Sequence, residues 1–307
     1  MSNTIAYASI FQEELDKQML VGATSGWMEP NSSLVKYSGG NEVKIPNIMM
    51  DGLGDYNRSD GFVKGSVNTT WQTHELTQDR GRTFSIDSMD VDESNFVATA
   101  GAVMGEFQRT KVIPEVDAYR YSKIAALAIA GDKASGGYTV AEATILNKLL
   151  ADIANLQDTI GEGDPLILTL PFTVAALLDA NTTIQKRMDV IEFEQGGIKT
   201  KVKSLDGHPI IRVPSARLKT AYEFLDGETA GQEAGGFKVA AGAKDINWII
   251  STRNAPIAIS KTDKPRIFDP NTNQQADAWK IDYRKYHDLW IPTNKLAGVF
   301  VNVKEAL

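Results

Sequence analysis

The sequence of 307 residues contains no cysteine. This lack excludes disulfides, zinc–thiolate sites and cysteine nucleophiles, and it fits a reducing cytoplasm. Histidine is scarce as well, and the three histidines lie far apart in the sequence, at His74, His208 and His287. There is no long basic run, and the formal net charge is −7. We therefore expect no basic face that would grip nucleic acid through its phosphates.

Long hydrophobic runs are missing too. No apolar stretch approaches the length that spans a membrane, and the N-terminal residues lack the basic and apolar regions of a signal peptide. Hydrophobic residues make up 42% of the chain and charged residues 23%, which is typical of a globular protein. Helical and strand-like segments occur without a regular βαβ rhythm, so the sequence favours an α+β fold.

Residues 4–20 are predicted to form a short amphipathic helix. Tyr7, Phe11 and Leu15 recur at every fourth position and Met19 continues the stripe, with acids and amides between them. We expect the stripe to dock on the core of its own chain, and the alternative partner is a neighbouring chain.

Residues 33–88 are predicted to form one long β excursion with little hydrophobic mass. Val43 and Ile45 alternate with charged residues until Pro46 interrupts the pattern. After a glycine-rich segment, a second strand places Trp71 on one face together with threonines.

The excursion is predicted to close at QDRG, residues 78–81, where a turn sends the chain back over residues 83–86. A pair of strands this thin is marginal in water by itself. We therefore expect it to pack against another surface.

The longest predicted helix follows, from Asp92 to Gly131. Pro114 has no amide hydrogen and should kink or break it. Beyond this helix the pattern predicts a buried strand at 166–170 and a β-hairpin with its turn at Asp206-Gly207. Apolar and alternating segments from residue 246 to the C-terminus are predicted to be strands that close a sheet.

Three glycine-rich or acidic segments partly match known binding motifs, and each lacks a residue that its motif requires. The G-x-G at Gly52 and Gly54 meets Asn57 where a dinucleotide fingerprint needs a third glycine, and it lies between two strands. GDKASGGY has Gly137 where a phosphate-binding loop needs lysine, and DPNTNQQADAWK has Lys280 where a calcium loop needs glutamate. We therefore expect no enzyme activity, no catalytic residue, no cofactor and no metal site.

Several stretches, and their order along the chain, are similar to the major capsid proteins of tailed bacteriophages. KVIPEVDAYRYSKIA resembles the end of the long helix of that family, which is called the spine helix. DGHPIIRVPSARL resembles a hairpin of its axial domain, and KPRIFDPNTNQQADAWKIDYRKYHDLWI resembles its closing peripheral strands. The resemblance implies the Hong Kong 97-type capsid fold.

The resemblance divides the chain into four parts: an N-terminal arm (1–32), an extended β-hairpin loop (33–88), a peripheral domain with the spine helix (89–135 and 256–307) and an axial domain (136–255). It implies self-assembly into hexamers and pentamers of an icosahedral shell around double-stranded DNA, which is bound without sequence specificity. A portal protein and, because the N-terminal segment is short, a separate scaffolding protein are implied partners. The implied location is the virion, assembled in the host bacterial cytoplasm.

The resemblance also suggests which residues contact neighbouring subunits. The candidates lie on the N-terminal arm and on the extended loop: Tyr7, Phe11, Leu15, Asp55, Arg58, Asp60, Lys64 and Trp71. Some family members join a loop lysine to a neighbour's asparagine by an isopeptide bond. Lys64 lies in the corresponding loop, but neither the asparagine nor the assisting acid can be matched.

Two other classes of function remain open on the sequence. An encapsulin-like compartment shares the fold and encloses a cargo enzyme instead of a genome. A soluble enzyme with an unrecognised site is the other alternative, and the oligomeric mass of the chain separates it from both shells.

Overall fold

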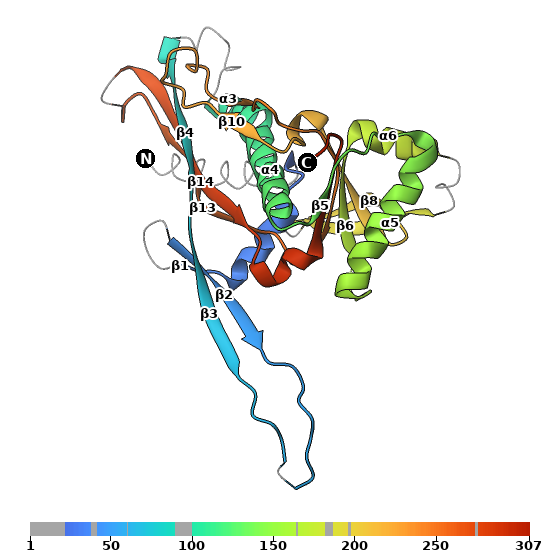
Figure 1. Cartoon of the computed structure of the whole chain (residues 1–307). Coiled ribbons are helices and arrows are strands. Elements are labelled where there is room, and N and C mark those ends of the chain that lie inside the picture. The colour runs from blue at the N-terminus through green and yellow to red at the C-terminus, as the bar shows by residue number, and fades with distance from the viewer. Residues whose placement is uncertain are drawn as a thin grey trace.

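The structure is a computed structural model, and it describes residues 22–37, 42–59, 61–89, 100–163, 165–181, 187–195, 198–273 and 276–307. A body of packed helices and sheets carries a long two-stranded hairpin that projects away from it (Figure 1). Among the described residues, no helix combines the length and the apolar character needed to cross a membrane. The mixture of helices and mainly antiparallel sheets, with parallel pairs only at β6–β9 (residues 166–171 and 208–213) and β15–β5 (residues 299–303 and 134–135) among the described strands, confirms the α+β class expected from the sequence.

The strands of the described residues form four sheets. The hairpin sheet contains β1 (Lys36–Tyr37), β2 (Glu42–Met50) and β3 (Val67–Glu75). A second three-stranded sheet has the order β13 (Ile257–Phe268), β14 (Ala278–Trp290) and β4 (Gln78–Asp87). A two-stranded sheet pairs β10 (Tyr222–Phe224) with β11 (Phe237–Val239).

The largest sheet lies in the body and has seven strands. Their spatial order is β5 (Ala134–Ser135), β15 (Val299–Val303), β12 (Ile246–Thr252), β6 (Leu166–Pro171), β9 (His208–Val213), β8 (Ile198–Leu205) and β7 (Met188–Gln195). The helices are α3 (Ala100–Phe107), α4 (Ile113–Ala130), α5 (Glu142–Ile160) and α6 (Phe172–Ala180), with a π-helical turn η2 (Gln108–Val112) between α3 and α4. Short 3₁₀ helices are η1 (Gly26–Leu34), η4 (Ser215–Arg217) and η5 (Thr293–Gly298).

The seven-stranded sheet separates two hydrophobic cores. Alternate side chains of β12 point to opposite faces, so Trp248 joins one core and Ile249 the other. The first core contains α5 and α6, and the second contains α4 and η1, which bring Leu149 and Tyr121 against the sheet. Because both faces are covered, β6 is buried along its whole length, as its apolar sequence predicts.

The long helix is continuous from α3 to α4 over the described residues. It does not end at Pro114, the second residue of α4. Because proline donates no N–H, the regular ladder of hydrogen bonds cannot continue through it, and the chain forms the π-helical turn η2 just before it. The predicted helix start near Asp92 lies outside the described residues.

Two predictions about the β excursion are wrong. Pro46 does not interrupt a strand but lies inside β2, opposite Trp71. Past Lys44, β2 is paired on one side only within the described residues, and a strand edge tolerates the missing N–H of proline.

The predicted turn at 78–81 is also wrong, because these residues open β4. β4 leaves the hairpin and pairs with β14 from Gln78–His287 to Asp87–Ala278. Gly81 lies so close to this partner that a Cβ atom would come within 2.8 Å of the Tyr283 carbonyl oxygen. The glycine therefore permits a close approach of two strands, not a turn.

The predicted turn at Asp206-Gly207 is confirmed. It joins β8 to β9, and both residues have positive φ angles of 49° and 84°. Two such residues between antiparallel strands are typical of a type I′ turn, which asparagine or aspartate followed by glycine favours.

Candidate intersubunit surface of the long hairpin

The long hairpin, residues 42–75, is built from β2, β3 and the segment that joins them. The two strands pair without interruption from Glu42–Glu75 to Met50–Val67, nine residues on each side. At about 3.4 Å per residue, the paired part is about 30 Å long. The joining segment, residues 51–66, is called the tip below, and it lies farthest from the body (Figure 1).

The base of the long hairpin is anchored to the body. Val43 and Ile45 are buried in a cluster with β13 and β14 residues, among them Trp290. The His74 ring stacks on the Trp290 ring with 5.4 Å between centroids, and the Gln72 side-chain amide donates to the Thr293 hydroxyl. These contacts fix the direction in which the hairpin leaves the body.

The outer half of the long hairpin presents an apolar face to solvent. The strand register places Pro46, Met50, Val67 and Trp71 on one face, opposite the face that carries Val43. Met50 is 72% exposed and Trp71 43% exposed. Within the described residues no second layer of structure covers these exposed side chains, and exposed apolar faces of this kind are typical of interfaces between chains.

The tip exposes large apolar side chains as well. Leu53 is fully exposed and Phe62 is 87% exposed, and the Phe62 ring contacts the Tyr56 ring at 4.9 Å between centroids. Asn57 and Gly61 exchange two backbone hydrogen bonds, which turn the chain between the two rings. The tip therefore holds an aromatic pair at its end in a defined turn.

The neck of the tip is closed by Asp51 and Ser66. The Asp51 carboxylate accepts hydrogen bonds from the Ser66 backbone N–H and hydroxyl, both at 2.7 Å. These two bonds lower the pKa of Asp51 below its ordinary value. The carboxylate thus continues the strand pairing by one further step past Met50.

The contact residues expected from the sequence lie partly on this surface. Asp55, Arg58 and Lys64 are exposed on the tip, and Trp71 lies on the apolar face of β3. Asp60 and the helix candidates Tyr7, Phe11 and Leu15 lie outside the described residues. The crosslink considered for Lys64 stays a prediction, because the asparagine would belong to a neighbouring subunit.

Sequence reasoning missed the apolar residues of this surface, which are Met49, Met50, Leu53, Tyr56, Phe62 and Val63. The charged residues and glycines between them suggested a polar loop. A signal was available: six large apolar side chains within fifteen positions follow neither the helical nor the strand period of a core-facing segment.

The charged groups buried around α4 are paired with other groups of the same chain. Asp117 accepts hydrogen bonds from the backbone N–H and hydroxyl of both Thr24 and Ser25, and it pairs with Arg217 at 3.1 Å. The neighbouring Arg120 is fully buried and pairs with Glu29 at 2.6 Å. These bonds tie the first described residues to α4.

A second network joins α4 and β14 to the segment just before β4. The Asp288 carboxylate accepts from the Tyr119 hydroxyl at 2.5 Å and from Thr77. Burial, followed by the Asp288 charge, raises the pKa of Tyr119 well above its ordinary value. Among the described residues, no group of three histidine, aspartate or glutamate side chains could hold a metal ion.

Comparison with known proteins places this architecture among phage capsids. The chain is similar to a structure of the mature capsid of bacteriophage PhiM1 at 10% identity and a TM-score of 0.57, covering 88% of this chain and 84% of that chain. It is similar to the capsid structure of cyanophage P-SCSP1u at 10% identity and a TM-score of 0.55, covering 89% and 86%.

A third similar structure is a virus-like particle from Pyrococcus furiosus, at 10% identity and a TM-score of 0.53, covering 97% of this chain and 99% of that chain. Phage structures make up most of the matches with comparable scores. No family model and no curated protein matches the sequence. At these identities the likeness establishes the fold. The chain has the Hong Kong 97-type fold of phage capsid proteins that its sequence motifs resemble.

Proposed function

We propose that the chain is a major capsid protein, which self-assembles into the icosahedral head shell enclosing the double-stranded DNA of a tailed phage or prophage. The observation that carries this proposal is the long hairpin. Its base is packed into the body, while its outer half and tip hold Met50, Phe62 and Trp71 in solvent. Covering these side chains requires another chain, and many identical contacts of this kind close into a shell.

In the proposed shell, residues 42–75 are the extended loop that reaches a neighbouring subunit. The peripheral domain combines α3, α4 and the β13–β14–β4 sheet, so it includes β4 in addition to residues 89–135 and 256–307. The axial domain corresponds to residues 136–255, and its β10–β11 hairpin packs back onto the peripheral part through Phe224 and Tyr119. We assign residues 1–32 to the N-terminal arm, of which the last part packs on its own chain through Trp27 and Met28.

The proposed partners follow from this role. Subunits meet as hexamers and pentamers, with a portal protein and a scaffolding protein as further partners. A formal net charge of −7 suits a container wall, because a wall that bound DNA tightly would hinder packaging and release. The role is structural rather than enzymatic, and the proposed location is the virion, with assembly in the host bacterial cytoplasm.

The direct test is the mass of the expressed chain. Size-exclusion chromatography and negative-stain electron microscopy should reveal particles of megadalton mass with a closed outline. A chain that stays monomeric or dimeric at high concentration, also when co-expressed with its scaffolding protein, contradicts the proposal and favours a soluble protein of another class.

A second function is supported by the match that spans 97% of this chain and 99% of the virus-like particle chain. In this reading the shell is encapsulin-like and encloses a cargo enzyme. Purified particles separate the two functions, because a cargo shell carries a second protein in its lumen and forms without a portal or scaffold. A genome shell carries nucleic acid when it is isolated from a phage.

A further inference from the structure

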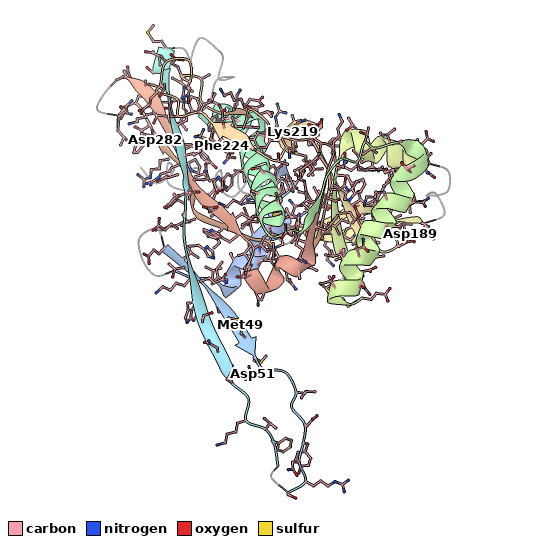
Figure 2. All side chains as sticks on the ribbon, viewed as in Figure 1. Met49, Asp51, Asp189, Lys219, Phe224 and Asp282 are labelled. Carbon is pink, nitrogen blue, oxygen red and sulfur yellow. The ribbon has the colours of Figure 1, made fainter. Side chains whose placement is uncertain are left out.

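A strap formed by residues 222–239 lies across α4 and reaches β4. It consists of β10, β11 and the loop between them, residues 225–236. Phe224 lies next to α4 and close to β4 (Figure 2). Its ring contacts the Tyr119 ring edge-on at 5.6 Å between centroids, and the Arg80 guanidinium carbon lies 5.8 Å from the ring centre. The strap therefore bridges two elements that are far from it in the sequence.

One arginine closes the neck of the strap. Arg80 on β4 donates to the Leu225 carbonyl oxygen at 2.9 Å and to the Gly236 carbonyl oxygen at 3.1 Å, the two ends of the loop. The Leu225 N–H donates to the same Gly236 oxygen at 2.9 Å. The guanidinium also pairs with the Glu115 carboxylate on α4. Arg80 thus ties β4, α4 and the strap together at one point.

A second arginine fits into a notch of the loop. Arg82 lies on the same face of β4 as Arg80 and donates to the Glu233 carbonyl oxygen at 3.0 Å. Gly227 and Gly235 border its guanidinium and have positive φ angles of 80° and 63°. A Cβ atom on Gly227 would come within 2.8 Å of the Arg82 Nη1 atom. Gly227 is therefore required twice, by its backbone conformation and by the arginine beside it.

Outside these contacts little holds the strap. Every side chain from residue 219 to residue 245 is exposed or partly buried, and none of them belongs to the hydrophobic cores. The apolar contacts are ring contacts, among them Phe224 with Tyr119 and Phe237 with Tyr222. Segments with few buried apolar contacts open at a lower free energy than the core does. The strap can therefore detach while the cores stay folded.

We propose that the strap is a latch and that Arg80 is its catch. In the closed state it covers Tyr119 and holds α4 against β4. In the open state it lifts as one unit, because the Asp226 carboxylate keeps the loop folded through hydrogen bonds from the Glu228 and Thr229 backbone N–H groups, both at 2.9 Å. The latch gives the chain one arrangement in which α4 is braced on β4 and one in which it is released. It is a property of the single chain and is independent of the proposed shell function.

Hydrogen–deuterium exchange of the full chain tests the latch. Arg80→Met removes the bonds to both carbonyl oxygens and keeps a long side chain. Amides of β10 and β11 should then exchange roughly tenfold faster, because hydrogen bonds from a charged group are lost. Amides of β14 and β6 should keep their wild-type rates. Arg284→Met is the matched control: it removes an exposed arginine that pairs with Asp79 on the same sheet, and it should leave the exchange of the strap unchanged.

Arg80→Lys separates charge from geometry. Lysine keeps the positive charge beside Glu115 but lacks the planar fork of arginine, so exchange of the strap should be intermediate. Wild-type exchange of the strap in Arg80→Met overturns the latch. Equal acceleration in β14 overturns it as well, because Arg80 would then hold the sheet together and not the strap.

A variant on the strap itself covers the case in which Arg80→Met does not fold. Gly227→Ala should displace the Arg82 guanidinium from its notch and speed up exchange in the strap alone. Unchanged exchange in this variant contradicts the latch. Assembly enters none of these outcomes, so a failed latch leaves the shell function standing, and a chain that forms no particles leaves the latch standing.

Discussion

The long hairpin and the region around α4 distribute polar and apolar side chains in opposite ways. Around α4 the protein buries charge: Asp117 and Arg120 are fully buried, and each has several partners within the chain. On the hairpin it exposes apolar surface, with Met50 and Phe62 in solvent. Both arrangements are unusual, because charges belong outside and large apolar groups inside unless something pairs or covers them.

The difference lies in where the compensating partner is found. The carboxylate of Asp117 is satisfied by Thr24, Ser25 and Arg217 of the same chain, so the α4 region is complete in the monomer. The exposed apolar residues of the hairpin, such as Met50 and Phe62, have no covering layer within the described part of the chain. Substitutions in the α4 region should therefore act on folding, and substitutions on the tip should act on assembly.

The largest expected effect is that of Asp117→Asn. In the variant, the NH₂ group of the amide would face N–H and hydroxyl donors of Thr24 or Ser25, and these donors would lose their acceptor. Arg217 would lose its charge partner. Removing one partner from a buried charge network costs about 3–5 kcal/mol. Urea unfolding of a chain kept monomeric at low concentration measures the loss. Asp55→Asn on the tip is the matched control and should leave the unfolding midpoint unchanged.

A smaller effect should appear as the pH falls. Burial lowers the pKa of His287 well below its ordinary value, with Lys285 and Arg120 adding to the shift, and burial also lowers the pKa of His74. The unfolded chain binds protons at these histidines near pH 6.5, whereas the folded chain binds them only at lower pH. The free energy of unfolding is therefore highest above about pH 6.5 and decreases as the pH falls below it. For each pH unit by which the pKa of a histidine is lowered in the folded state, the free energy of unfolding decreases by about 1.4 kcal/mol once the pH is below the lowered pKa.

Phenylalanine substitutions test this dependence, because they keep a ring and remove the titration. The ring of His287 contacts Tyr119 and that of His74 stacks on Trp290. We expect His287→Phe to flatten the stability profile between pH 7 and pH 5, and His74→Phe, at a half-buried site, to flatten it less. A His287→Phe chain with the full wild-type pH dependence would contradict the account.

Charge reversal on the tip should leave folding untouched. Arg58 and Lys64 are exposed, so the double variant Arg58→Glu/Lys64→Glu should unfold at the wild-type midpoint. Juxtaposed like charges at an interface cost several kcal/mol, so the yield of particles should fall steeply. The double variant Arg58→Lys/Lys64→Arg keeps both charges and should assemble normally. A normal particle yield from the reversed variant would show that these charges play no part in assembly.

Local patterns predicted the elements that local forces decide. The Asp206-Gly207 turn follows from the positive φ angles that a type I′ turn requires, and the burial of β6 follows from its uninterrupted apolar residues. The alternation around Val43 and Ile45 and the Trp71 face likewise predicted β2 and β3. In each case neighbouring residues carry enough information.

The misses concern tertiary pairing. Taken alone, Gly81 and Pro46 indicate the end of a strand, yet each lies inside one. Gly81 allows a close approach to the Tyr283 carbonyl oxygen, and Pro46 lies where β2 is paired on one side only within the described residues. The partner of β4 is β14, about two hundred residues later in the chain. No local sequence pattern predicts this pairing. Phe62 and Tyr56 were overlooked as contact residues because apolar side chains between glycines and charges have no period.

The central claim is that the tip joins subunits and contributes nothing to the fold of the monomer. Replacing residues 51–66 by Asn-Gly should close β2 and β3 with a type I′ turn, because Met50 and Val67 are already paired. Sedimentation velocity of this shortened chain beside the wild type is the most direct measurement. The account predicts a folded monomer with the wild-type unfolding midpoint and no particles, while the wild type forms particles of megadalton mass. A shortened chain that assembles into the same particles would contradict it.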